Sequence, residues 1–192
     1  MKKKLCLALS GALCLSAGVG CGTETAEETL TPVRLNEVVH SVFYAPQYVA
    51  QELGFFEEEG LDVSVAVGNG ADKSMTALLS DSADIALLGT EAGLYVYAEG
   101  KADYPKTFAQ LTQRAGNFLV SREEEPDFQW SDLERKSVIG GRLGGMPEMV
   151  LEYVIKENGM TIGKDMEIIN NIDFTSTAGA FLGEVGDYTV EF

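Results

Sequence analysis

Two arginines are the residues of this chain whose chemistry is easiest to interpret. Arg114 and Arg142 each follow a segment that is expected to form a strand, on opposite lobes of the expected fold. A guanidinium group offers a planar fork of N–H donors that matches a carboxylate, a sulfonate or a phosphate. Each arginine can therefore bind an anionic ligand, or it can form an ion pair with one of the many acidic residues, and the sequence leaves both alternatives open.

Catalytic and metal chemistry has little support among the remaining residues. The cysteines Cys6, Cys14 and Cys21 all lie in the first 21 residues, and His40 is the single histidine of the chain. A thiol nucleophile, a His-pair metal site or a hydrolytic triad would need such residues in the body of the protein. Residues 140–145, Gly-Gly-Arg-Leu-Gly-Gly, match neither a Walker loop nor a Rossmann fingerprint. We therefore expect a protein that is not an enzyme and that uses no cofactor and no metal.

The composition excludes one large class of partners. The chain of 192 residues has 14 Lys and Arg against 30 Asp and Glu, for a formal net charge of −16. Such a polyanion repels phosphate backbones, so we expect no nucleic-acid partner. With 45% hydrophobic residues the chain can bury a core, and its length suits one domain, or one domain and part of another.

The first segment of the chain indicates export. Three lysines at residues 2–4 precede a mostly apolar run at residues 5–19, and small residues then lead to Cys21. This order is typical of a bacterial signal peptide, and residues 16–21 resemble a lipobox with Gly18 where an apolar residue is usual. We expect a signal peptide at residues 1–20, then a lipidated Cys21 and a flexible tether at 21–31, on a protein anchored to the extracytoplasmic face of the cell membrane. The alternative is an ordinary signal or a plain N-terminal anchor, although the run is short against the roughly 20 residues of a membrane span.

Alternating strands and helices are expected from residue 33 onward. Alternation of apolar and polar residues, or a continuous apolar run, predicts five strands, at residues 33–39, 61–67, 83–88, 107–112 and 118–121. Helices are expected between them, the first opening at Pro46 and ending before Gly60, and the next two capped by Asp72 and Thr90. Such alternation is typical of a parallel sheet with helices on both sides.

A second set of elements is expected after a charged connector at residues 123–127. It contains a helical turn at 130–133, helices at 146–158 and 178–182, and strands at 137–140, 166–172 and 187–192. The longer helix is expected to place Met146, Met149, Val150, Tyr153 and Val154 on one face. We therefore predict an α/β protein with a first lobe at residues 32–118 and a second lobe at residues 119–192.

The loops that follow the expected strands are the natural place for a ligand. In open α/β sheets, ligands bind beyond the carboxyl ends of the strands, where loops meet helix N-termini. The loops here are residues 40–44, 68–72, 89–91, 113–114 and 141–146, in which glycine and small polar residues are frequent. Glycine lets a ligand approach the backbone closely, but it is also an ordinary turn residue, and both roles stay open. Phe43 and Tyr44 can likewise line a pocket or belong to the core.

Several segments together resemble a known family. Residues 41–50, Ser-Val-Phe-Tyr-Ala-Pro-Gln-Tyr-Val-Ala, and residues 53–63, Leu-Gly-Phe-Phe-Glu-Glu-Glu-Gly-Leu-Asp-Val, resemble the opening of ABC-transporter substrate-binding proteins of the nitrate/sulfonate/taurine and thiamine-pyrimidine-precursor family. Residues 69–72, 77–80, 83–86 and 140–145 are similar to later blocks of that family. The resemblance covers residues 33 to about 192.

The resemblance implies a periplasmic-binding-protein-like (type II) fold that closes on a small polar or anionic organic ligand and delivers it to an ABC permease. It places ligand contacts on both lobes, to which we add Arg114 from its position after a strand: Ser41, Phe43, Tyr44, Gln47, Gly70, Ala71, Asp72, Thr90, Glu91, Arg114, Arg142, Gly144, Gly145 and Met146. The arginines favour an anion, whereas Phe43, Tyr44 and Trp130 allow an aromatic heterocycle.

The chain departs from the family at its end. Relatives continue beyond the point where this chain stops at Phe192, so the resemblance implies a second lobe that lacks strands and a second hinge crossing. We therefore expect a truncated product or a partial gene model. Two other functions remain open: a binding module that feeds a sensor, and an enzyme on the same scaffold. The pyrimidine-synthase branch of such enzymes needs a cysteine-rich motif and a catalytic histidine, whereas the body of this chain has no cysteine and only His40.

Overall fold

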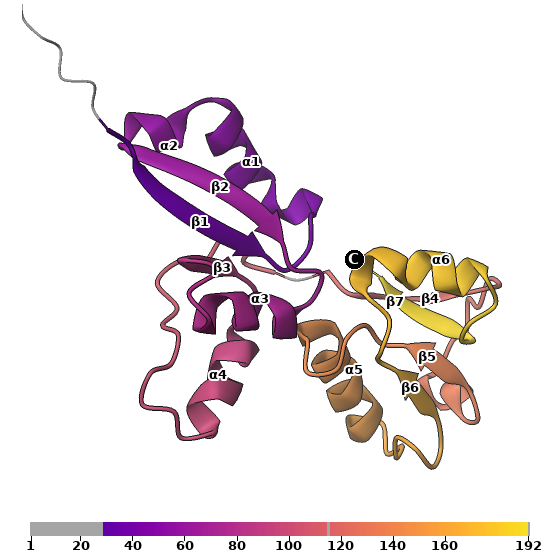
Figure 1. The fold of residues 1–192 in the computed structure, drawn as a ribbon. Helices are drawn as coiled ribbons and strands as arrows, with labels where there is room; N and C mark the ends of the chain where they lie inside the picture. The colour runs from indigo at the N-terminus through magenta and orange to yellow at the C-terminus, as the bar shows by residue number, and fades with distance from the viewer. Residues whose placement is uncertain (1–28, 115, 192) are drawn as a thin grey trace, which may run out of the picture.

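The computed structural model describes residues 29–114 and 116–191, which form two α/β lobes, each built on its own sheet (Figure 1). The expected signal peptide and Cys21 lie outside these residues. The described part of the chain contains no helix that is long and apolar enough to cross a membrane. The predicted domain limits at residues 118 and 119 stay a prediction, although the two sheets use strands from residues 31–87 and 118–191.

The first sheet is parallel, with the strand order β2-β1-β3. It consists of β1 (Thr31–Glu37), β2 (Leu61–Val67) and β3 (Ile85–Leu87). The chain moves from β1 to β2 in one direction and from β2 back past β1 to β3 in the other. Because β-α-β crossovers are right-handed, this reversal places the connecting helices on opposite faces of the sheet.

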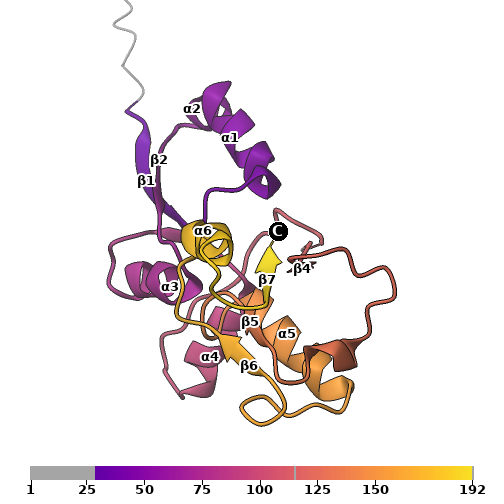
Figure 2. The same cartoon turned by 90° about the vertical axis from the view of Figure 1, so that its right-hand side faces the viewer.

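The helices of the first lobe follow this expectation. Figures 1 and 2 show α1 (Ala45–Glu52) and α2 (Phe55–Glu58) on one side of the β1–β2 pair, away from α3 (Ala71–Leu79) and α4 (Thr90–Ala98). A one-turn 3-10 helix, η1 (Val42–Tyr44), precedes α1. The sequence predicted one helix in place of α1 and α2, but Gly54 adopts a left-handed backbone conformation, φ 76°, that interrupts it.

The second sheet is mixed, with the strand order β4-β7-β5-β6. It consists of β4 (Phe118–Ser121), β5 (Ser137–Ile139), β6 (Glu167–Ile169) and β7 (Tyr188–Glu191), and β4 runs antiparallel to β7. The expectation of a parallel arrangement is therefore wrong for this edge, because β4 enters from the first lobe and pairs beside the last strand. The helices of this lobe are α5 (Met146–Glu157) and α6 (Thr177–Leu182), with 3-10 turns η2 (Trp130–Leu133) and η3 (Phe174–Ser176).

Two local predictions are corrected by the structure. Residues 107–112 form no strand, since a strand needs a neighbour to share its hydrogen bonds and no described strand pairs with this segment. Asp72 and Thr90 do not cap their helices. Gly70 and Gly89 occupy the N-cap positions, so both polar residues lie in the first helical turn.

The buried face of α5 also differs from the prediction. Leu151 and Ile155 are buried, together with Pro147 and Glu148, whereas the predicted Tyr153 is 64% exposed. Leu151 and Ile155 join the core of the second lobe, which also contains Leu133, Val138, Met160, Met166, Tyr188 and Val190. The spacing of apolar residues on α5 allows two overlapping stripes, and contact with the β5–β7 sheet decides between them.

Candidate ligand-binding site between the lobes

A cavity of about 170 Å³ opens where the two lobes meet. From the first lobe it is lined by residues that follow β1 and β3, including Val38, Leu88 and Gly89. From the second lobe it is lined by the start of α5 and by Phe174. These positions are carboxyl ends of strands and starts of helices, which is the arrangement in which open α/β sheets bind ligands.

The cavity gathers eight of the fourteen residues that the sequence singled out. They come from both lobes and are Ser41, Phe43, Tyr44, Ala71, Glu91, Arg114, Gly145 and Met146. The other six do not line it and are Gln47, Gly70, Asp72, Thr90, Arg142 and Gly144. Ligand binding by any of the fourteen residues stays a prediction. The structure places the last six off the cavity lining.

Gln47 is directed to a buried carboxylate. Its Nε2 donates to Oε2 of Glu37 at 3.1 Å, and the Tyr48 hydroxyl donates to the same oxygen at 2.8 Å. The other oxygen of Glu37 lies 2.9 Å from Nδ1 of His40. Glu37 is fully buried at the end of β1, so these donors satisfy a charge that would otherwise be costly to bury. His40 is therefore part of a hydrogen-bonded group just after the end of β1.

Arg142 joins the lobes. Its guanidinium donates to both oxygens of Asp72, at 3.1 and 2.5 Å, and to Oδ1 of Asp173 at 2.8 Å. Lys73 adds a second interlobe pair with Asp173 at 3.2 Å. Burial opposes ionisation of Asp72, but the hydrogen bond and charge of Arg142 outweigh it and lower the pKa of that carboxyl. Of the two alternatives left open for Arg142, the structure shows the ion pair.

The predicted glycines support the loops of the site. Gly144 adopts a left-handed conformation, φ 75°, and its N–H donates to Glu148 Oε2 at 3.1 Å. Gly89 leaves the space above it to the Glu91 carboxylate, which a Cβ at that position would strike. Gly144 therefore needs the conformational freedom of glycine, whereas Gly89 leaves room for the Glu91 side chain.

The walls of the cavity are largely apolar, with a few polar groups. Phe43, Tyr44 and Met146 contribute to the lining, and Arg114 lies on it as an exposed cation. Burial, together with the charge of Glu37, raises the pKa of Tyr44 to about 12, so its hydroxyl keeps its proton at any physiological pH. A ligand with an apolar body and a small number of polar groups matches such a lining.

Sequence reasoning missed several lining residues. The strand ends that the rule for α/β sheets indicates include four of them, Val38, Val39, Leu87 and Leu88, so these positions could have been predicted. No sequence pattern indicated Phe174 as a lining residue, because it reaches the cavity from a 3-10 turn of the second lobe. No cluster of metal-ligating side chains exists among residues 29–114 and 116–191.

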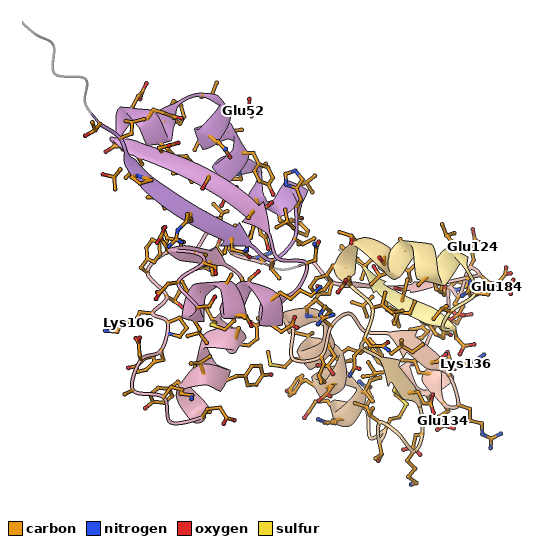
Figure 3. The ribbon with its side chains drawn as sticks, in the orientation of Figure 1. Glu52, Lys106, Glu124, Glu134, Lys136 and Glu184 are labelled. Carbon is orange, nitrogen blue, oxygen red and sulfur yellow. The ribbon has the colours of Figure 1, made fainter. Side chains whose placement is uncertain are left out.

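Several charged side chains lie on the outside of the two lobes. Figure 3 labels six of them on the outside of the ribbon, Glu52, Lys106, Glu124, Glu134, Lys136 and Glu184. Such residues carry the net charge of the chain at the surface, which favours solubility and leaves the cavity between the lobes as the candidate site.

Two lobes with a cavity between their strand ends define the binding-protein class of α/β folds, and solved structures agree. The alkanesulfonate-binding protein SsuA from Xanthomonas axonopodis pv. citri, bound to MOPS, matches with a TM-score of 0.58 at 16% identity, over 84% of this chain and 54% of that one. The periplasmic aliphatic sulphonate binding protein SsuA from Escherichia coli matches with a TM-score of 0.56 at 14% identity, over 83% and 53%. These likenesses confirm the periplasmic-binding-protein-like fold.

Sequence comparison supplies the family. The family model described as NMT1/THI5 like matches residues 42–190. A curated relative, “Putative binding protein YtlA” of Bacillus subtilis (strain 168), is 52% identical over 166 residues, which are 86% of this chain and 50% of that protein. The chain therefore belongs to the NMT1/THI5-like family of substrate-binding proteins, as the sequence blocks indicated. It spans about half the length of the curated relative that it matches.

Proposed function

We propose that this protein is an extracytoplasmic solute-binding protein that captures a small polar organic ligand between its two lobes and delivers it to an ABC permease. The observation that carries this proposal is the cavity lined from both lobes at the carboxyl ends of the strands. Family membership and the binding-protein names of its relatives support the same function. The cavity lining offers no nucleophile with an adjacent base, which favours binding over catalysis.

A ligand-binding measurement tests the first part. We would follow thermal unfolding and calorimetric titration of the purified chain with sulfonates, nitrate, bicarbonate, pyrimidine precursors and small amines. A ligand that binds only the folded state, at about a hundred times its dissociation constant, should add ~2.7 kcal/mol to the free energy of unfolding. Ala71→Leu, which fills the cavity, should abolish the effect. Ala98→Leu, on the exposed face of α4, should leave it unchanged.

Anchoring to the membrane is a separate part of the proposal. The basic and apolar leader before Cys21 supports export and lipidation, and this segment lies outside the described residues. Mass spectrometry of the protein from its membrane fraction should show a diacylglyceryl group on Cys21. Cys21→Ala should release the protein from the membrane. A chain that retains residues 1–20 and carries no lipid would contradict the lipoprotein.

Delivery to a permease has its own test. Genes for a permease and an ATPase are expected beside the gene for this protein. The ligand-loaded protein should stimulate ATP hydrolysis by that complex in proteoliposomes, whereas the Ala71→Leu variant should not. Binding without any stimulation would favour the alternative of a module that feeds a sensor.

A further inference from the structure

Three buried glutamates differ in how their oxygens are satisfied. Glu37 and Glu148 have donors for both oxygens, the latter from the Gly144 N–H and from Asn170 Nδ2 at 3.3 Å. Glu91 is only 3% exposed, yet its Oε2 has no hydrogen-bond partner among the described residues. Glu91 also lines the interlobe cavity. A buried oxygen without a partner is costly, and its presence in a binding cavity indicates a group that arrives with the ligand.

Burial is the dominant influence on Glu91 and raises the pKa of its carboxyl, while nearby backbone N–H groups oppose that shift. Glu91 is the second residue of α4, and its own backbone N–H acts to lower the pKa of the carboxyl. The N–H of Met146, the first residue of α5 in the other lobe, acts in the same direction. The starts of two helices, of 9 and 12 residues, therefore meet at one carboxylate, and the positive ends of helix dipoles stabilise a negative charge.

Among the described residues, no arginine or lysine contributes to the pKa of Glu91. Burial raises this pKa, and the two backbone N–H groups lower it. Arg142 is engaged by Asp72 and Asp173. Arg114 is an exposed side chain on the lining of the same cavity.

We propose that the cavity binds a small organic cation, an amine or amidine with an apolar body, whose N–H donates to Glu91 Oε2. The inference rests on the proposed solute-binding function and names the chemical class of its ligand. The cation supplies the missing donor and charge, while Phe43, Tyr44 and Met146 contact the apolar body. An anion would be placed beside a buried carboxylate that has no partner for one oxygen, where like charges repel. Because Met146 approaches Glu91 from the second lobe, ligand binding and lobe closure use the same carboxylate.

The test compares probes of similar shape and opposite charge. Benzamidinium and benzylammonium carry a cationic N–H donor on a flat apolar ring, whereas benzoate and benzenesulfonate carry an anion. We expect calorimetry of the purified chain to detect binding of at least one cation and to give weaker or no binding of the anions. Glu91→Gln keeps the size of the side chain and an acceptor for Met146, but it removes the charge and should weaken cation binding at least about tenfold.

Two controls separate a ligand contact from a structural role. Glu99→Gln removes an exposed charge from the other end of the same helix and should leave the affinity for the cations unchanged. Urea unfolding should show that Glu91→Gln still folds cooperatively. Cation binding to the natural protein should also weaken as the pH falls through the pKa of Glu91, and the variant should not show this dependence.

Three outcomes would overturn the proposal. They are comparable or tighter binding of the anions, unchanged cation affinity in Glu91→Gln, and no binding of either cation at millimolar concentration. The failure of this inference is distinguishable from failure of the proposed function. An anion or a neutral solute that binds, and that Ala71→Leu excludes, would keep the solute-binding protein and remove only the cation.

Discussion

Two carboxylates near the carboxyl ends of the first sheet differ in a way that separates structure from function. Glu37, at the end of β1, is surrounded by donors from its own lobe, Gln47, Tyr48 and His40. Glu91, after β3, lines the cavity, lies near backbone N–H groups from both lobes and has one buried oxygen without a hydrogen-bond partner among the described residues. The first arrangement is complete without a ligand. The second one becomes complete only when a donor enters, which is the expected property of a binding group.

The largest effect is expected at the satisfied carboxylate. Glu37→Leu leaves the Gln47 amide and the Tyr48 hydroxyl without their acceptor, and it should lower the free energy of unfolding by about 3 kcal/mol, because each unpaired buried group costs roughly 1–3 kcal/mol. Urea unfolding measures this change. Glu52→Leu on the exposed face of α1 is the matched control, with a change within about 0.5 kcal/mol. A loss of less than about 1 kcal/mol in Glu37→Leu would remove the contrast between the two carboxylates.

The next effect concerns the space that Gly89 leaves for Glu91. A methyl group at Gly89 strikes the carboxylate, so Gly89→Ala should destabilise the protein by about 1–3 kcal/mol. Gly93→Ala is the matched control on α4, where the added Cβ meets Pro105 at an ordinary 3.7 Å and should be neutral or stabilise by up to about 1 kcal/mol. Adding Glu91→Ala to the Gly89→Ala variant should restore most of the lost free energy of unfolding. If it does not, the collision is not the cause.

A smaller effect is expected from the titration of Glu91. Burial raises its pKa above the ordinary 4.5, so the folded protein binds the proton more tightly than the unfolded chain does. The contribution of Glu91 to stability is thus fully present below about pH 4.5 and is lost as the pH rises through the raised pKa. Without ligand, Glu91→Gln should become more stable relative to the natural protein across this window. Urea unfolding at a series of pH values measures the difference, and a flat difference contradicts the raised pKa.

The smallest effect on stability is expected at the ion pairs between the lobes. Arg142→Met removes the pairs with Asp72 and Asp173, whose side chains are 49% and 41% exposed, so the free energy of unfolding should fall by at most about 1 kcal/mol. The shape should change more, since these pairs hold the lobes together, and small-angle scattering should show a larger radius of gyration. Lys156→Met, which removes a pair inside α5, is the control that should leave the radius unchanged. An unchanged radius in Arg142→Met would show that the remaining contacts, including the Lys73–Asp173 pair, keep the lobes closed.

Much of the architecture could be predicted from the sequence, because the patterns that indicate strands and helix ends are local. The alternation at residues 61–67 predicted β2 with its observed bounds, and Gly60 has the left-handed conformation expected after a helix, φ 77°. The same patterns predicted a strand at residues 107–112 that the structure lacks. A local pattern predicts a tendency to form a strand, but the hydrogen bonds of a strand need a partner that the pattern does not contain.

The sequence by itself determined most of the order of strands and helices, the family and the edge of the sheets at which the cavity lies, since these follow from hydrophobic period, local motifs and the rule for open α/β sheets. Only the tertiary structure decided which polar side chains stay open to a ligand. Arg142 meets Asp72, which lies 70 residues away, and Glu91 meets the start of α5 in the opposite lobe. Such contacts depend on which surfaces meet when the lobes close, and the spacing of residues along the chain does not predict this.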